Sequence, residues 1–452
     1  MVYIPHTDAE RQAMLEAIGV KSLEELFWDI PEKFRYPQLD LPEPLSEMET
    51  LQELQFLAEL NLNTNTTPTF LGAGAYRHWV PSVVDYVISR GEFYTAYTPY
   101  QAEVSQGTLQ AIFEYESMIC DLTGMDAANA SHYDGATAAA EAIIQAYNVF
   151  RKKRSKIVLA PTVHPHYRQV IHTYTQGMGL EIVGGDDPTT TVAQLTELVD
   201  DQTACLVLQT PDFLGQLHDL AGLADIVHAR GKDAQFVVIV NPISLGLFKP
   251  PGDYGVDTVV GEGQPLGLGL NFGGPYLGFY ATRSQYVRQM AGRLVGKTVD
   301  IEGKDGYVMT LTTREQHIRR DKATSNICSN QGLMALAATV YMAALGKHGL
   351  RKVAELNYHK AHYAADAIDA VEGFSVVRRK PFFNEFVVRC PAPVDEINAF
   401  LLDAIEGVEI IGGYDLMQNY PHLADAMLVA VTEMNSRHEI DLLAEALNAF
   451  ND

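Results

Sequence analysis

The chain has 452 residues, of which 47% are hydrophobic and 20% are charged, as in ordinary folded globular proteins. This length exceeds that of one ordinary domain and predicts about two to three domains. The net charge of -24 argues against a nucleic-acid partner, because phosphate neutralisation requires clustered Lys and Arg side chains.

The cysteines and the N-terminal residues indicate a reducing compartment. The four cysteines are scattered, with neither a C-x-x-C pair nor a metal-ligand spacing, so we expect reduced thiols and no metal site. The first residues are polar and charged where a signal peptide would be apolar. No window approaches the roughly 20 apolar residues of a membrane span. We therefore expect a soluble, cytoplasmic protein without a membrane partner.

Residues 1–65 are predicted to form an arm. Helical spacing of apolar residues predicts helices over 7–20, 22–31 and 48–60, and a proline-rich linker precedes the last of them. Bulky apolar side chains in the second helix need another domain or subunit to cover them. These side chains are Leu26, Phe27 and Trp28.

Residues 66–331 alternate between short apolar runs and amphipathic stretches. Continuous apolar strands separated by helices, here over 192–201 and 220–231, predict an α/β domain with a mainly parallel sheet. Ligands of such sheets lie beyond the carboxyl ends of the strands. The predicted strands are 156–161, 180–185, 204–211, 235–242, 257–261 and 276–282.

Residues 332–452 are predicted to form a smaller α+β domain with its own core. A long helical stretch over 331–371, broken near Gly346 and Gly349, leads into it. The predicted strands are 374–379, 385–390, 408–413 and 426–433, and the predicted helices are 395–405 and 438–450.

The start of an alanine-rich helix is a candidate anion site. Asp134, Gly135 and Thr137 precede or open this helix, where free N–H groups and the helix dipole favour an anion. Plain capping of the first turn by Asp134 or Thr137, with no bound phosphate, explains the same residues more simply. His164, at the end of a strand, is able to stack on a cofactor ring, although a loop histidine satisfied by its neighbours is the commoner case.

Two residues required by one large group of α/β enzymes are missing. Pyridoxal-phosphate enzymes of this architecture need an acid at the end of a central strand and a lysine at the end of a later strand. The central strand here ends in Asn241, which cannot carry the negative charge. The glycine-rich loop after the later strand contains no lysine, since Lys249 is followed only by Lys297. The chain should therefore not bind this cofactor covalently.

Two further stretches are candidate binding segments. A loop around Pro99 is rich in tyrosine and threonine, and such hydroxyls and ring faces suit the wall of a ligand pocket or tunnel, or equally a polar interface. A basic turn over 314–331 offers cations and donors that suit a carboxylate or a phosphate, or else forms a solvated connection between domains. The donors of the turn include Ser325 and Ser329.

Several long stretches, in order along the chain, carry a resemblance to one family. They are YIPHTDAERQAMLEAIGVKSLEELFWDIPE, YTPYQAEVSQGTLQAIFEYESMICDLTGMDAANAS, YDGATAAAEA, GEGQPLGLGLNFGGPYLGF and RRDKATSNICSNQ. The chain resembles, over essentially its whole length, the α subunits (subunit 1) of two-subunit bacterial glycine decarboxylases, the P-proteins of the glycine cleavage system. The resemblance implies the fold of fold-type I pyridoxal-phosphate enzymes.

The resemblance also implies that two homologous subunits divide the work. Only the partner, the β subunit (subunit 2), keeps the lysine that binds pyridoxal phosphate, while the chain without it keeps the fold. In this chain Gln264 stands near the lost lysine and Asn241 near the missing acid. The implied vestigial pocket contains Asp134, Gly135, Thr137, His164, Asn241 and Gln264.

The implied reaction belongs to the complex and not to this chain alone. Glycine loses carbon dioxide at the partner's cofactor, and the aminomethyl group passes to the lipoyl arm of H-protein. This chain would hold the partner's site in shape and wall a path for that arm. Dimers of this fold bring loops of one subunit to the other's site, so both candidate segments contribute residues there. These are Tyr94, Tyr97, Thr98, Tyr100, Arg320, Lys322 and Asn326.

Two other classes of function compete with this interpretation. One is a self-sufficient pyridoxal-phosphate lyase or desulfurase, against which the missing lysine argues. The other is a free-standing, non-catalytic interaction protein of the same fold. A neighbouring reading frame with a lysine in the equivalent loop would separate them. The sequence leaves open which residues touch the partner's cofactor and whether the complex is a heterodimer or a dimer of heterodimers.

Overall fold

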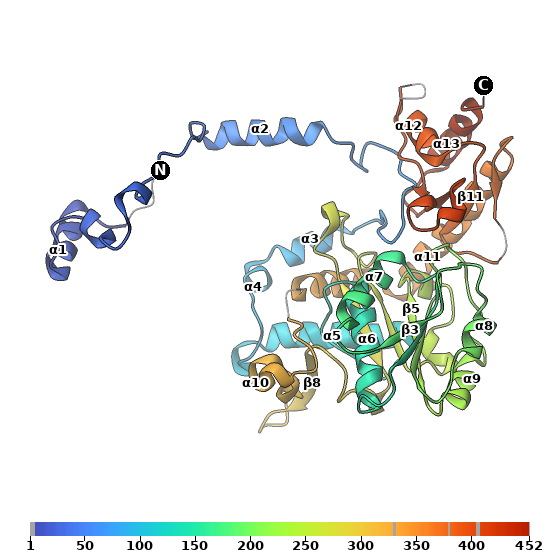
Figure 1. Ribbon diagram of the computed structural model, residues 1–452, viewed down its shortest axis with the longest axis horizontal. Coiled ribbons are helices and arrows are strands. Elements are labelled where there is room, and N and C mark those ends of the chain that lie inside the picture. Colours follow the sequence, from blue (N-terminus) through green and yellow to red (C-terminus); the bar gives the residue numbers. More distant parts are fainter. Residues whose placement is uncertain (1–4, 329–330, 378–379, 404–406, 452) are drawn as a thin grey trace. The chain divides into compact units, whose positions relative to one another are not determined.

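The computed structural model describes residues 5–328, 331–377, 380–403 and 407–451 (Figure 1). It divides into two compact units, Met1–Leu62 and Asn63–Asp452. The predicted end of the arm, residue 65, lies close to the end of the first unit.

The first unit contains two capped helices and two 3-10 turns. Helix α1 (Asp8–Ile18) and helix α2 (Glu47–Glu59) confirm the predicted helices over 7–20 and 48–60, and both open with a capping box. The predicted helix over 22–31 is wrong in type: the turns η1 (Glu24–Phe27) and η2 (Glu32–Phe34) lie there. The stretch is short and ends at a proline, so it cannot build a ladder of α-helical hydrogen bonds. None of these four elements has a buried residue.

The second unit is built on a seven-stranded, mainly parallel sheet of order β1-β7-β6-β5-β4-β2-β3. Strands β2 to β6 run parallel to one another, whereas β7 pairs antiparallel with both β6 and β1. The six strands that the sequence predicts for this region are all confirmed. The strands are β1 (Ala127–Ala128), β2 (Lys156–Leu159), β3 (Glu181–Val183), β4 (Thr203–Gln209), β5 (Gln235–Val240), β6 (Thr258–Glu262) and β7 (Gly278–Thr282).

The centre of this sheet is covered on both faces. Every residue of β5 and nearly every residue of β4 is buried, and successive side chains of a strand point to opposite faces. Helix α6 (Gly135–Val149) packs against β4 to β7, and α9 (Leu223–Arg230) packs against β5. The other helices of this part are α3 (Ser82–Ile88), α4 (Gly91–Tyr94), α5 (Gln106–Thr123), α7 (Pro165–Thr175), α8 (Val192–Glu197) and α10 (Gln316–Arg319).

A two-stranded hairpin, β8 (Leu294–Val299) and β9 (Asp305–Thr310), is absent from the sequence prediction. It packs against α5. Its turn places Gly303 at φ 80°, a conformation that glycine adopts without strain. The turn residues Asp300 to Gly303 are the signal that would have revealed it.

The small domain has a four-stranded antiparallel sheet of order β10-β11-β13-β12. The predicted strand over 408–413 is misplaced: Ile411 forms only an isolated bridge with Thr69, and the sheet strand follows it as β12 (Tyr414–Asp415). Gly412 lies so close to α12 that a side chain there would meet Asn398. The remaining elements are β10 (Ser375–Val376), β11 (Glu385–Arg389), β13 (Ala426–Ala430), α12 (Val394–Leu402) and α13 (Arg437–Ala449).

Helix α11 (Gly332–Asp369) runs from the large domain into the small one. It kinks at Gly346, where φ is 57°, one of the two glycines predicted to break it. Its length and composition would allow it to cross a membrane. The sequence expectation that no window approaches a membrane span is therefore wrong for this helix. However, Ala335 and Tyr341 are buried in the core of the large domain, and Ala361 and Ile368 in that of the small domain. This burial is typical of a core helix.

Candidate functional site

A cavity of about 400 Å³ lies at the carboxyl ends of the parallel strands, where the fold predicts a ligand site. We call it the Glu262 cavity. Two predicted pocket residues, Asp134 and His164, line it. The other described residues of its wall are Ala73, Gly74, Ala75, Tyr133, Ala136, His166, Tyr167, Glu262, Gly273, Pro275, Tyr276 and Gln331.

The start of α6 at this cavity has a complete cap. The Asp134 carboxylate accepts a hydrogen bond from the Thr137 backbone N–H at 2.7 Å, and Thr137 Oγ1 accepts one from the Asp134 N–H at 3.2 Å. The simpler of the two sequence interpretations, capping, therefore describes these two residues. Gly135 is packed tightly: a Cβ there would lie 2.3 Å from the Tyr167 hydroxyl oxygen.

Glu262, at the end of β6, fills the space in front of this helix start. Its Oε2 accepts a hydrogen bond from the Gly135 N–H at 2.9 Å, and its Oε1 accepts from the N–H groups of Gln264 at 2.9 Å and Leu277 at 3.0 Å. Burial raises the pKa of Glu262 to about 7, although these donors pull it down. Sequence analysis missed Glu262 as a site residue; the signal was a carboxylate at the strand end that opens the glycine-rich loop.

His164 is a neutral, fully engaged histidine. Burial lowers its pKa to about 4. Nε2 lies 2.9 Å from the Ala73 carbonyl oxygen, so it carries the proton, and Nδ1 accepts from the His166 N–H at 3.1 Å. The ring stacks on Tyr167, with ring centroids 4.9 Å apart. One face of the His164 ring is thus already stacked on a ring of the protein itself.

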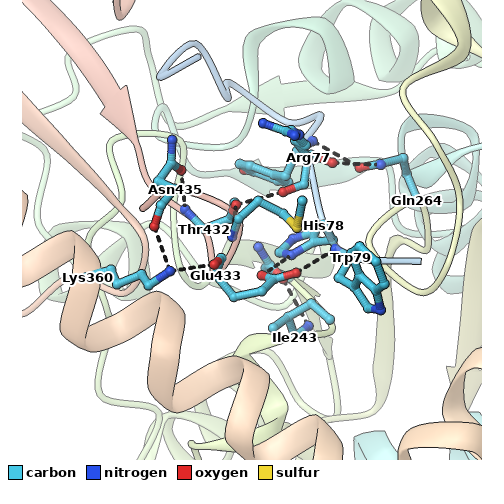
Figure 2. A network of polar contacts seen from close by, with 12 residues as sticks. Arg77, His78, Trp79, Ile243, Gln264, Lys360, Thr432, Glu433 and Asn435 are labelled. Carbon is cyan, nitrogen blue, oxygen red and sulfur yellow. Dashed lines mark hydrogen bonds and ion pairs between the residues drawn. The ribbon is translucent and has the colours of Figure 1, made fainter. Parts of the chain in front are cut away.

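Gln264 and Asn241 do not belong to the wall of this cavity. Gln264 is fully buried and pairs with the backbone of Tyr76: Oε1 accepts from the N–H at 3.0 Å and Nε2 donates to the carbonyl at 2.8 Å (Figure 2). It also donates to the Leu268 carbonyl oxygen at 2.9 Å. Asn241 accepts from the Ile243 N–H at 3.0 Å and shapes a turn. The structure gives both predicted residues a structural partner.

The segment that Gln264 holds is also clamped to the small domain, as Figure 2 shows. His78 Nδ1 lies 2.8 Å from the Glu433 carboxylate, which also accepts from the Trp79 N–H at 2.7 Å. Lys360 Nζ donates to the carbonyl oxygens of Glu433 at 2.5 Å and Asn435 at 2.6 Å. These contacts fix residues 76–79 to the small domain, and this segment directly follows the wall residues 73–75 of the Glu262 cavity.

Pyridoxal phosphate does not fit the Glu262 cavity. The described residues of its wall include two carboxylates and neither a lysine nor an arginine. The flanking lysines lie elsewhere: Lys249 Nζ sits 4.7 Å from the ring centroid of Tyr254, and Lys297 pairs with Asp305 at 2.7 Å. Among the described residues, no group of three His, Cys, Asp or Glu side chains could hold a metal ion.

A second cavity, of about 440 Å³, lies beneath the tyrosine-rich loop. We call it the tyrosine cavity. Three of the predicted loop residues, Tyr94, Tyr97 and Thr98, line it, together with α5 and the start of α11. Tyr97 is 80% exposed, and Tyr94 and Tyr100 are also exposed. These rings are available for contact with another molecule.

The basic turn lies next to this loop. Arg320, Lys322 and Asn326 are all exposed, and Arg320 has a φ of 53°, which is strained for a residue with a side chain. The predicted donor Ser329 lies outside the described residues. Ser325 is not an open donor, because its hydroxyl donates to the Glu141 carboxylate of α6 at 2.5 Å. Burial raises the pKa of Glu141 to about 7.

Arg293 joins the loop to the turn, and sequence analysis missed it. Its Nη2 donates to the Tyr100 hydroxyl at 2.9 Å, and its Nε donates to the Glu315 carboxylate at 3.0 Å. The Tyr100 ring also meets the His317 ring, with centroids 5.5 Å apart. Only a tenth or so of the Arg293 side chain is exposed. The structure therefore brings together the two stretches that the sequence singled out separately.

Comparison with known proteins finds one family over nearly the whole length of the chain. Residues 1–447 match the family described as glycine cleavage system P-protein. A protein of Thermomicrobium roseum, named probable glycine dehydrogenase (decarboxylating) subunit 1, is 57% identical over 450 residues, which are 99% of each chain. A protein of the same name from Desulforamulus reducens is 51% identical over 454 residues, with complete coverage of both.

Solved structures agree with this placement. A glycine decarboxylase (P-protein) of the glycine cleavage system, in inhibitor-bound form, superposes with a TM-score of 0.88 at 42% identity, covering 99% of this chain and 100% of that one. A glutamate decarboxylase of Lactobacillus brevis has a TM-score of 0.67 at 15% identity, covering 94% and 96%, which shows the fold alone. The predicted α/β fold of fold-type I pyridoxal-phosphate enzymes and the predicted family are thus confirmed: the chain belongs to the glycine cleavage system P-protein family.

Proposed function

We propose that the chain is the glycine decarboxylase subunit that does not bind the cofactor, and that it works in the cytoplasm with a second, lysine-bearing subunit. The full-length match to relatives named subunit 1 carries this proposal. The Glu262 cavity supports it, because the described residues of its wall include two carboxylates and neither a lysine nor an arginine to hold the phosphate of the cofactor. The exposed apolar side chains of the arm, including Trp28 at 79%, support a partner that covers them.

The substrate of the complex is glycine, and the acceptor of its aminomethyl group is the lipoyl arm of H-protein. Pyridoxal phosphate, held by the partner, supplies the electron sink that lets glycine lose carbon dioxide. This chain contributes by positioning groups at the mouth of the partner's site. It supplies no lysine and no resident cofactor.

The groups that this chain offers come from the tyrosine loop and the basic turn. Tyr94, Tyr97, Thr98 and Tyr100 present hydroxyls and ring faces beside a cavity, and Arg293 holds Tyr100 against the turn. Exposed cations on the turn suit a small carboxylate such as that of glycine. The groups of the turn are Arg320, Lys322 and Asn326.

The test is a comparison of the isolated chain with the co-expressed complex. We expect the complex, given lipoylated H-protein, to exchange the carboxyl carbon of glycine with labelled bicarbonate, and the isolated chain to show no exchange. Reduction of the complex with borohydride should place the pyridoxyl group on the partner. Exchange by the isolated chain, or a pyridoxyl-lysine on it at Lys249 or Lys297, would refute the proposal.

A further inference from the structure

We infer that Glu262 is a built-in anion, which takes the place of a phosphate group at the start of α6 and keeps the Glu262 cavity closed to phosphate esters. The chain has thus replaced a ligand by one of its own side chains. This inference concerns anion binding by the chain itself and does not depend on the reaction that the complex catalyses.

Geometry is the first support. The start of a helix offers free backbone N–H groups that attract an anion, and glycine there allows close approach. In this chain the Gly135 N–H already donates to Glu262 Oε2 at 2.9 Å. The other carboxylate oxygen collects two N–H groups of the glycine-rich loop, from Gln264 and Leu277. Three donors from two separate segments converge on one carboxylate, which is the arrangement expected around a bound oxyanion.

Space is the second support. A Cβ on Gly135 would meet the Tyr167 hydroxyl oxygen at 2.3 Å and the Glu262 backbone nitrogen at 2.8 Å. The space beside Gly135 is therefore occupied by the Tyr167 hydroxyl and the Glu262 backbone, while the Glu262 carboxylate fills the position in front of the Gly135 N–H. Both residues also line the cavity that remains.

Charge is the third support. Asp134 lies beside Glu262 in the cavity wall and adds to the negative potential there. His164 cannot compensate, because its lowered pKa keeps it neutral at physiological pH. An entering phosphate dianion would face the Asp134 carboxylate and the partly ionised Glu262 carboxyl group, without a lysine or arginine in the described wall.

The prediction is that removing the carboxylate opens a phosphate site. In Glu262→Ala the N–H groups of Gly135, Gln264 and Leu277 lose their acceptor and point into an enlarged cavity. We expect the full-length Ala variant to bind inorganic phosphate at least tenfold more tightly than the parent in isothermal titration calorimetry. Pyridoxal 5′-phosphate should bind the variant too, without a covalent bond.

Two controls separate this effect from a general loosening of the fold. Glu262→Gln keeps the volume and loses the charge, so it should bind phosphate more weakly than Glu262→Ala. Glu141→Ala removes a different buried carboxylate, which lies on α6 away from the start of that helix, and should gain no phosphate binding. Near-ultraviolet circular dichroism establishes that each variant is folded. If Glu262→Ala fails to fold, Glu262→Ser is the substitute, since its hydroxyl satisfies one of the three donors.

Equal phosphate affinity in the parent and in the folded Ala or Ser variant would overturn the inference, as would a gain of the same size in Glu141→Ala. Because calorimetry requires no glycine turnover, these outcomes are independent of the exchange assay. A complex that fails to exchange glycine would leave the role of Glu262 untouched.

Discussion

The two cavities of the large domain are similar in size and opposite in chemistry. The Glu262 cavity lies where a fold of this type places a ligand, yet its polar groups are saturated by one another and its wall is acidic. The tyrosine cavity lies away from the strand ends, exposes aromatic rings and adjoins a basic turn. The groups at the strand ends are thus engaged within the protein, whereas the rings of the tyrosine-rich loop remain exposed to another molecule.

The largest expected effect concerns Arg293, which joins the tyrosine-rich loop to the basic turn. Arg293→Ala leaves Glu315, only 13% exposed, with His317 at 3.6 Å as its remaining ion-pair partner, and breaking the mostly buried arginine pair destabilises the chain by roughly 3 kcal/mol. Urea unfolding of the variant measures this loss. Arg351→Ala, which removes an exposed helix-surface pair with Glu355, should change stability by less than about 0.5 kcal/mol. Equal effects of the two variants would show that Arg293 is an ordinary surface residue.

A second prediction tests whether the tyrosine cavity serves the reaction. Lys322→Ala and Tyr97→Phe should each lower glycine–bicarbonate exchange by the complex about tenfold or more, since one charge-assisted contact contributes roughly 1.5–3 kcal/mol. The complex should still assemble and still bind cofactor. Lys352→Ala, an exposed lysine on α11, is the matched control and should leave exchange unchanged. Parent rates in both variants would mean that the loop and the turn are structural.

A third prediction concerns the pH dependence of the Glu262 cavity. The pKa of Glu262 is raised from 4.5 to about 7 in the folded chain, so the folded state binds more protons than the unfolded state between these values. Its contribution to stability is therefore complete below about pH 4.5 and is lost as the pH rises to about 7. The titratable groups that share this cavity are Tyr133, Asp134, His164, His166, Tyr167 and Tyr276.

The difference between parent and Glu262→Gln isolates this contribution, because every other titrating group largely cancels. As the pH rises from 4.5 to 7.5, the free energy of unfolding of the Gln variant should increase relative to that of the parent by roughly 1–2 kcal/mol, after allowance for the partial exposure of Glu262. Chemical denaturation at several pH values measures the gain. A difference that does not vary with pH would show that the carboxylate titrates near its ordinary value.

The smallest expected effect tests the cap at the same helix start. Asp134→Ala removes the acceptor of the Thr137 N–H and should destabilise the chain by about 1 kcal/mol. Asp134→Asn keeps an acceptor and should recover most of this loss in thermal unfolding. If Asn and Ala lower the melting temperature equally, the negative charge of Asp134 matters more than its hydrogen bond.

Local signals in the sequence predicted most of the fold, because they are local in the structure as well. Apolar runs mark the six strands from β2 to β7, and Thr7 marks the start of α1 by capping. The hairpin β8–β9 was missed because its strands are partly exposed and lack a clear alternation of apolar and polar residues. The strand predicted over 408–413 failed because the tight approach of Gly412 to Asn398 on α12 displaces the chain from the sheet.

The site was only partly predictable, because its key contacts join residues far apart in the chain. Glu262 meets Gly135 across 127 positions, and Arg293 meets Tyr100 across 193 positions. No spacing rule connects such pairs without the fold. The missing lysine could be read from the sequence, but the side chain that fills the vacated anion site could not.

The burial of Gln264 has an evolutionary consequence. A lysine at this position would place an ammonium among the backbone groups of Tyr76 and Leu268, where the Gln264 carbonyl now accepts the Tyr76 N–H. That donor would lose its acceptor, and the new charge would be buried without a counter-ion. Opening an anion site would in addition require the loss of the Glu262 carboxylate, which now accepts the Gly135 N–H. A lysine at position 264 would therefore cost stability without opening a phosphate site, so a cofactor site in this cavity would require at least two coordinated substitutions.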